Sequence, residues 1–272
     1  MLLFSNLKKY LLESNIYFNN IIHHTNNIVI NRSMRLKLPN YVLDLPTEIR
    51  CYNDGHSLQA WYKNGNKLHR EGDLPAEIYY YKNGQPEREI WHKNGKWDRE
   101  RDLPNFIFYY KNGQPKIKRW YKNNKLHRDG DLPALIQYYE NGQPSEFSWY
   151  KNGKSHREGD LPAEIEYFEN GQLKNESWHK NGKWHREEDL PAEIYYYKNG
   201  QSKVQRWYKS GKFHRKGDFP AEIQYFEDGQ LKNESWYKNG KKHRARDLPA
   251  EIHYYEDGQL KNESWYKNGK KA

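Results

Sequence analysis

Histidine followed by arginine recurs along this chain, and metal sites and acid–base centres are often built from such residues. The histidines are His69, His127, His156, His185, His214 and His243. His156 and His185 are 29 positions apart, and equivalent residues of a stacked β-repeat lie ~9 to 10 Å apart. The ligands of one zinc ion must each lie about 2 Å from the metal, so histidines of successive repeats are too far apart to bind the same ion. Asp98 also replaces histidine in one copy. The pattern therefore predicts a structural role, in which Arg or His bonds an aspartate or a carbonyl of the following bend.

Carboxylates recur with the same spacing. Glu164, Glu193 and Glu222 fall on one face of the expected strands, too far apart for a two-carboxylate active site. We interpret them as solvated partners of nearby lysines. An enzyme needs a unique constellation of nucleophile, base and orienting group, whereas each polar residue of interest here is repeated. We expect no catalytic residue, no cofactor and no metal site, and the adjacent His23 and His24 do not change that expectation.

Lysines flank one set of turns with great regularity. Eight of them define the lysine rim: Lys151, Lys154, Lys180, Lys183, Lys209, Lys212, Lys238 and Lys241. The turns at the other end of the strands carry mixed charge, for example Lys111 and Lys198 but Glu140 and Glu169. Two interpretations remain open. The rim either keeps the turn tips soluble and blocks edge pairing, or forms a linear surface that binds polyanions.

The tripeptide Asp-Leu-Pro sets the period of the chain. It begins at Asp44, Asp73, Asp102, Asp131, Asp160, Asp189, Asp218 and Asp247, with phenylalanine for leucine at position 219. Each interval is 29 residues, and a period of this length is typical of stacked repeats. The sequence therefore predicts a non-repeat segment over residues 1–43 and eight 29-residue repeats over residues 44–272, the last of them truncated.

Turn dipeptides divide each repeat into strands. Asn83-Gly84 and Asn94-Gly95 are the two in one repeat, and such dipeptides favour type I′ β-hairpins because both central residues need positive φ. The pairs of turns leave no window long enough for a helix. We therefore predict an all-β fold, an elongated repeat array of antiparallel β-hairpins.

The alternation between turns predicts which side chains are buried. Leu74, Ala76 and Ile78 share one face of the first strand, and the returning strand contributes Trp91 to it. The predicted repeat core is Trp91, Trp120, Trp149, Trp178, Trp207, Trp236, Ile78, Ile107, Ile136, Ile165, Ile194 and Ile223. Tyrosine and glutamate, such as Tyr195 and Glu193, are assigned to the outer face.

Residues 176–186 read Glu-Ser-Trp-His-Lys-Asn-Gly-Lys-Trp-His-Arg, and an aromatic strand with a second Asn-Gly follows. This pattern resembles the MORN repeat, and is most similar to the divergent variant found in bacterial antitoxin-like proteins and in large DNA viruses of amoebae. The resemblance covers about residues 44–272, with a longer period and with His-Arg and Asp-Leu-Pro-Ala in place of glycines. It implies an elongated, non-catalytic hairpin array that serves as a scaffold, in dimerisation or at membranes. Choline-binding wall repeats also mix Trp, Asn-Gly and Tyr-Tyr, but place Trp-Tyr-Tyr close after the turn.

Composition limits the remaining choices. The chain has 272 residues, 35% apolar and 16% aromatic, so we expect a thin core of large rings. The net charge of +10 permits anionic partners without choosing among them. The single cysteine, Cys51, has no partner for a disulfide or a thiolate metal site.

Residues 1–43 lack the repeat. Leu3, Leu7 and Leu11 recur at helical spacing, which favours a short amphipathic helix over residues 2–13, either as a cap on the first repeat or as an anchor to a membrane or partner. Lys8 and Lys9 interrupt the apolar stretch, so it matches neither a signal peptide nor a transmembrane segment. We expect an intracellular protein.

The leading functional hypothesis is a non-enzymatic MORN-like scaffold that binds a protein partner, and a homodimer is one form of that hypothesis. The alternative is peripheral attachment to anionic phospholipid through the lysine rim. Nucleic-acid binding by the same rim, with tyrosines stacking on bases, ranks third.

Overall fold

The computed structural model describes residues 27–29, 37–38, 41–42, 44, 46–64 and 67–271. Within these residues every regular element is a β-strand and there is no helix. The all-β class and the repeated antiparallel hairpins predicted from the turns are confirmed. The helix expected over residues 2–13, and the pair His23-His24, lie outside the described residues.

The chain divides into two compact units, and the first comprises Met1–Asn124 with Glu140–Gly142. Its large sheet runs antiparallel in the order β1 (Asn27–Val29), β4 (Glu48–Cys51), β5 (Ser57–Ala60), β8 (Glu77–Tyr80), β9 (Pro86–Ile90), β12 (Phe106–Tyr109) and β13 (Pro115–Arg119). Its short strands are β2 (Lys37–Leu38), β3 (Tyr41–Val42), β6 (Tyr62–Lys63), β7 (Lys67–Leu68), β10 (His92–Lys93), β11 (Lys96–Trp97) and β14 (Tyr121–Lys122).

Strand β1 comes from the segment that the sequence set apart from the repeats. Its residues pair antiparallel with β4, with Asn27 opposite Arg50 and Val29 opposite Glu48. Part of residues 1–43 therefore adds a strand to the sheet of the repeats and covers the edge of β4.

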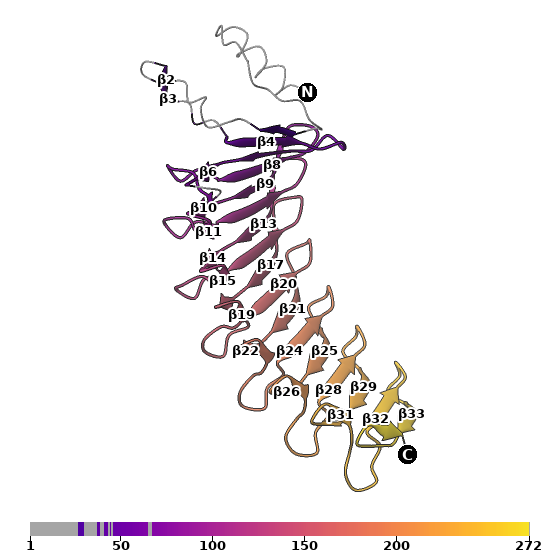
Figure 1. Cartoon of the computed structure of the whole chain (residues 1–272). Coiled ribbons are helices and arrows are strands. Elements are labelled where there is room, and N and C mark those ends of the chain that lie inside the picture. The colour runs from indigo at the N-terminus through magenta and orange to yellow at the C-terminus, as the bar shows by residue number, and fades with distance from the viewer. Residues whose placement is uncertain are drawn as a thin grey trace. The chain divides into compact units, whose positions relative to one another are not determined.

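The second unit comprises Lys125–Tyr139 and Gln143–Ala272. Its large sheet runs antiparallel in chain order through β16 (Leu135–Tyr138), β17 (Pro144–Ser148), β20 (Glu164–Tyr167), β21 (Leu173–Ser177), β24 (Glu193–Tyr196), β25 (Ser202–Arg206), β28 (Glu222–Tyr225), β29 (Leu231–Ser235), β32 (Glu251–Tyr254) and β33 (Leu260–Ser264). In Figure 1 these strands lie side by side, coloured from pink to yellow.

Small two-stranded hairpins accompany the large sheet of the second unit. Their strands are β15 (Lys125–Leu126), β18 (Tyr150–Lys151), β19 (Lys154–Ser155), β22 (His179–Lys180), β23 (Lys183–Trp184), β26 (Tyr208–Lys209), β27 (Lys212–Phe213), β30 (Tyr237–Lys238), β31 (Lys241–Lys242), β34 (Tyr266–Lys267) and β35 (Lys270–Lys271). A single residue, Trp178 for example, separates each large-sheet strand from its small hairpin. A long loop containing Asp-Leu-Pro then leads to the next repeat.

The two turns of each repeat differ in type. In the small hairpin Asn181 has φ 54° and Gly182 has φ 80°, as type I′ requires. In the large hairpin only Gly171 has positive φ, at 83°. Its N–H donates to the carbonyl of Phe168, and the register shifts between Glu166 and Tyr167. That geometry fits a type I turn followed by a glycine bulge, so the type I′ prediction was wrong for this turn.

Tryptophan and alanine form the core. All six predicted tryptophans are buried, and the alanine before the first strand of most repeats has no exposed surface. The six predicted isoleucines, Ile78, Ile107, Ile136, Ile165, Ile194 and Ile223, are only half-buried. Their position along the strand explains the difference. The alanine lies beside the tryptophan, since the carbonyl of Ala192 accepts the N–H of Trp178, whereas Ile194 lies two residues further along the strand, away from the indole ring.

Candidate functional site: the lysine turns and the long loops

The tight turn of each small hairpin presents two lysines. In the hairpin formed by β22 and β23, Lys180 lies directly opposite Lys183, and both are exposed. The same pairing occurs between Lys151 and Lys154. The lysine rim is therefore a series of cross-strand pairs of like charge, which is unfavourable for a hairpin in isolation.

Each turn of the second unit rests on the turn before it. The N–H of Gly182 donates to the carbonyl of Ser155 at 2.8 Å, and the N–H of Asn181 donates to Nδ1 of His156 at 3.4 Å. A Cβ on Gly182 would lie 3.5 Å from Cβ of Lys154, in ordinary contact. Gly240 and Gly269 make the same backbone bond to Phe213 and Lys242. These bonds hold equivalent lysines in a row with the period of the repeat.

The long loops neutralise the first lysine of some turns. Lys151 pairs with Glu158 at 2.7 Å and Lys180 pairs with Glu187 at 3.0 Å. The bond from Lys151, followed by that from His156, lowers the pKa of Glu158 to about 2. The lysine rim and the long loops are therefore adjacent, and the glutamates of the loops neutralise part of the positive charge of the rim.

The later turns lack this balance. The position of Glu158 and Glu187 is taken by Lys216 and by Ala245 in the next repeats. Within the described part of the chain, no carboxylate forms an ion pair with Lys209, Lys212, Lys238 or Lys241. The rim is therefore most strongly basic from residue 209 onward.

The recurring histidine and arginine have separate structural tasks. Nε2 of His156 lies 3.1 Å from Glu158, while its Nδ1 accepts the turn amide described above, a role that sequence reasoning missed. Arg157 follows the prediction, since Nε and Nη2 donate to Asp131 at 2.9 and 3.0 Å and Nη1 donates to the carbonyl of Pro162 at 3.3 Å.

Arginine also closes a clamp over the core. The guanidinium of Arg157 lies 3.8 Å from the centre of the Trp149 ring, and Nε1 of Trp149 donates to the carbonyl of Asp131. Asp131 has φ 53°, a left-handed conformation that aspartate tolerates better than most residues. Each clamp therefore joins the Asp-Leu-Pro that begins a repeat to the tryptophan and the arginine near the end of the same repeat.

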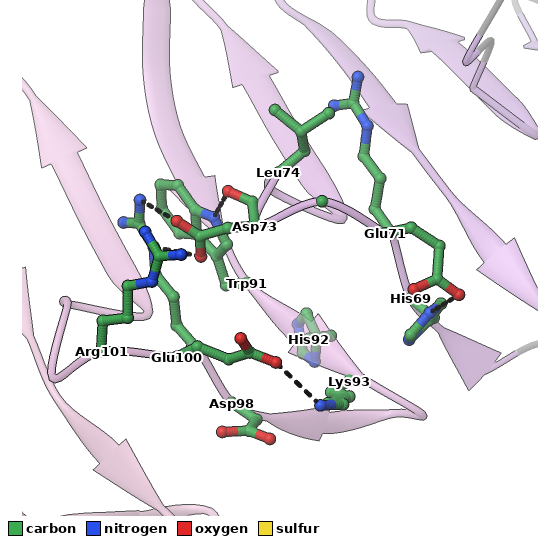
Figure 2. A pocket seen from close by; sticks show the side chains of 13 residues that line it. His69, Glu71, Asp73, Leu74, Trp91, His92, Lys93, Asp98, Glu100 and Arg101 are labelled. Atoms are coloured by element: carbon green, nitrogen blue, oxygen red, sulfur yellow. Dashed lines mark hydrogen bonds and ion pairs between the residues drawn. The ribbon is translucent and has the colours of Figure 1, made fainter. Parts of the chain in front are cut away.

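A pocket of about 540 Å³ lies between two successive long loops of the first unit. Figure 2 shows His69 and Glu71 on one side, Asp98 and Glu100 on the other, Lys93 between them, and Trp91 next to Asp73. The equivalent pocket that includes His156 in the second unit measures about 210 Å³. The shorter Asp98 side chain stands where other repeats have histidine, and the larger volume occurs at that position.

The leucine of Asp-Leu-Pro points to solvent, contrary to its assignment to the inner face with Ala76. Leu74 lies in the loop before β8, which begins at Glu77, so the alternation of the strand does not extend to it. The second unit therefore has a leucine row of exposed side chains: Leu132 at 42%, Leu161 at 46%, Leu190 at 39%, Phe219 at 58% and Leu248 at 38% exposed.

The glutamates assigned to solvent are instead largely covered. Glu193 and Glu222 are buried, and Arg206 lies between them, 3.0 Å from Glu193 and 2.9 Å from Glu222. Tyr208 of the small hairpin also donates to Glu193. The expectation failed because alternation cannot show that a second hairpin covers this face.

Glu164 lacks such a cation. Ser148 and Ser177 lie opposite it on the two neighbouring strands. Burial, together with the carboxylates of Glu146 and Glu166, raises the pKa of Glu164 to about 7.

Over the described residues, no group of three or more His, Cys, Asp and Glu side chains has the arrangement of a metal site. No helix in that part of the chain has the length and apolar character needed to cross a bilayer.

Comparisons with known proteins assign no family. No family model and no curated protein matches the chain. Among solved structures, the chain is similar to alternansucrase in complex with isomaltononaose, at 12% identity and a TM-score of 0.14, over 76% of this chain and 18% of that chain. The chain thus spans under a fifth of that protein, and a score this low supports no statement about fold or function. The MORN-type resemblance remains a prediction.

Proposed function

We propose that this chain is a non-enzymatic scaffold whose repeated surface binds a macromolecular partner. The observation that supports the proposal is the stacking of the small hairpins, in which the amide of Gly182 bonds the preceding repeat. Because this bond recurs, the same side chains stand at regular intervals along one side of a unit. Such a surface engages an extended partner through many weak contacts added together. The intracellular location expected from the sequence belongs to the same proposal.

Affinity capture from the native cell tests the scaffold. The full chain is compared with a chain that lacks the whole repeat Asp189–Gly217. We expect a stoichiometric partner whose retention falls in steps as whole repeats are removed. Capture of no partner by the full chain, or equal retention after two repeats are removed, contradicts the proposal.

A second candidate is attachment to an anionic phospholipid surface. It is favoured by Lys209, Lys212, Lys238 and Lys241, which face no carboxylate in the described structure. Each lysine near a charged bilayer contributes about 1 kcal/mol, and salt screens that attraction over ~8 to 10 Å.

Vesicle sedimentation separates this candidate from the first. Changing Lys209, Lys212, Lys238 and Lys241 to glutamate should abolish retention on phosphatidylserine vesicles. Changing Lys151 and Lys180, which are already paired with glutamates, should matter much less. A gel shift with single-stranded DNA examines the nucleic-acid alternative. If the wild-type chain ignores both vesicles and DNA at low salt, the rim is a solubility device.

A further inference from the structure

The leucine row places one large apolar side chain on the surface of every repeat in the second unit. Each of its five members is more than a third exposed, and none belongs to the core. Isolated surface leucines are common, but a row in register at one position of each repeat is the kind of apolar surface that marks an interaction site.

The spacing of the row selects among backbone conformations of a bound segment. Two strands per repeat at about 4.8 Å give roughly 9.6 Å between members. A polyproline II helix rises about 3.1 Å per residue with three residues per turn, so every third side chain lies on one face at about 9.3 Å. A β-strand puts every third side chain on alternating faces. An α-helix repeats its face every seven residues, about 10.5 Å, and drifts by several ångströms over the row.

A hollow beside the first member of the row suits an inserted side chain. The pocket of about 210 Å³ in the second unit is bounded by Leu132 and includes Trp149 and Arg157. Arg157 is already fixed over the indole, so the floor of this hollow is rigid. Tyr150 also lines the hollow, and aromatic side chains are a common feature of the grooves that bind polyproline II segments.

Charge around the row favours an acidic segment. Loops and rim are adjacent, because Glu187 of the loop pairs with Lys180 of the turn. Toward the end of the row the ammonium groups of Lys209, Lys216 and Lys238 form no ion pair with a carboxylate within the described residues. An acidic side chain between the apolar positions of the ligand would meet these ammonium groups.

We propose that the leucine row binds an acidic protein segment in the polyproline II conformation, with an apolar residue at every third position. This inference rests on the scaffold function proposed above and names the class of partner. The apolar residues seat beside successive members of the row, and the acidic residues face the rim.

Fluorescence anisotropy with a labelled peptide of five Leu-Pro-Glu repeats tests the inference on the full chain. We expect saturable binding that weakens at least about tenfold in the variant Leu161→Ser, Leu190→Ser and Phe219→Ser, because three apolar contacts are lost. The variant should keep its melting temperature, since these residues are exposed. The matched control is Leu260→Ser, which removes a leucine that is 54% exposed on β33 and should leave binding unchanged.

A peptide with one extra glutamate per repeat supplies the spacing control, and it should bind about tenfold more weakly because its leucines leave register. Equal binding of both peptides, or no binding of the first, overturns the inference. Loss of vesicle binding in the leucine-row variant without any peptide binding would assign the row to a bilayer instead. Continued capture of a native partner with no peptide binding would leave the scaffold standing and remove only this class of ligand.

Discussion

At the residue scale, Glu164 is a carboxylate that the fold holds without a cation. Its folded pKa, about 7, lies above its ordinary value of 4.5, so the folded state favours the protonated form. The group therefore stabilises the fold below about pH 4.5 and loses that contribution as the pH rises toward 7. Glu164→Gln should raise the free energy of unfolding at pH 8.5 by about 1 to 2 kcal/mol, allowing for partial screening, with little effect at pH 4.5. Denaturant melts at the two pH values measure the difference.

Glu193 supplies the control for that substitution. It occupies the equivalent position but pairs with Arg206 and accepts a bond from Tyr208. Glu193→Gln should lower stability at pH 8.5, because removing one partner leaves the half-buried guanidinium of Arg206 with less compensation. If both variants shift stability in the same direction at pH 8.5, the contrast between the two sites is wrong.

Replacing Trp178 tests the clamp that arginine and aspartate form around the tryptophan ring. Its ring is buried and lies under the guanidinium of Arg186, so Trp178→Ala should cost about 3 to 5 kcal/mol. Tyr195 is half-buried on the opposite face and donates to Glu193, so Tyr195→Ala should cost about 1 to 2 kcal/mol. Urea melts compare the two variants, and equal losses would mean that the indole is not the centre of the core.

At the scale of elements, the stacked turns should be visible in hydrogen exchange. The amides of Gly153, Gly182 and Gly240 donate to the preceding small hairpin. The amides of Gly159 and Gly217, in the long loops, donate to no backbone carbonyl within the described residues. We expect the first three to exchange roughly 10 to 100 times more slowly, since opening must break an inter-repeat bond. Equal exchange rates would show that the small hairpins move independently.

The sequence predicted the strands and turns more accurately than it predicted which side chains face the core and which face solvent. Asn94-Gly95 predicts its hairpin because few other residues tolerate two positive φ angles. The side of the chain on which Leu74 lies could not be predicted, since the alternation was extended to residue 74 whereas β8 begins only at Glu77. Burial of Glu193 depends on Tyr208, fifteen residues away in another hairpin. A sequence pattern of period two describes a single strand and cannot show that another hairpin packs over it.

At the scale of the whole molecule, the repeat should behave as the unit of stability. Removing Asp189–Gly217 joins Glu188 to Asp218 and keeps the clamps of Arg186 on Asp160 and of Arg244 on Asp218. The shortened chain should fold with a cooperative melt, because each neighbour presents the same interface. Circular dichroism during heating measures this.

Removing only part of a repeat is the matching control. A chain lacking Asp189–Gly200 loses β24 but keeps β25, so the antiparallel order of the sheet fails there. This chain should melt without cooperativity or aggregate. A cooperative half-repeat deletion beside an unfolded whole-repeat deletion would contradict the architecture.

The clamps also determine how the second unit responds to force. Because each arginine binds the aspartate that begins its own repeat, every repeat is closed by its own clamp, and a pull on the last repeat loads one clamp at a time. The unit should unzip in steps of nearly equal force. Each step would release 29 residues, or about 95 to 105 Å of extended chain. A chain of this design yields gradually under tension and can reseal repeat by repeat once the load is removed.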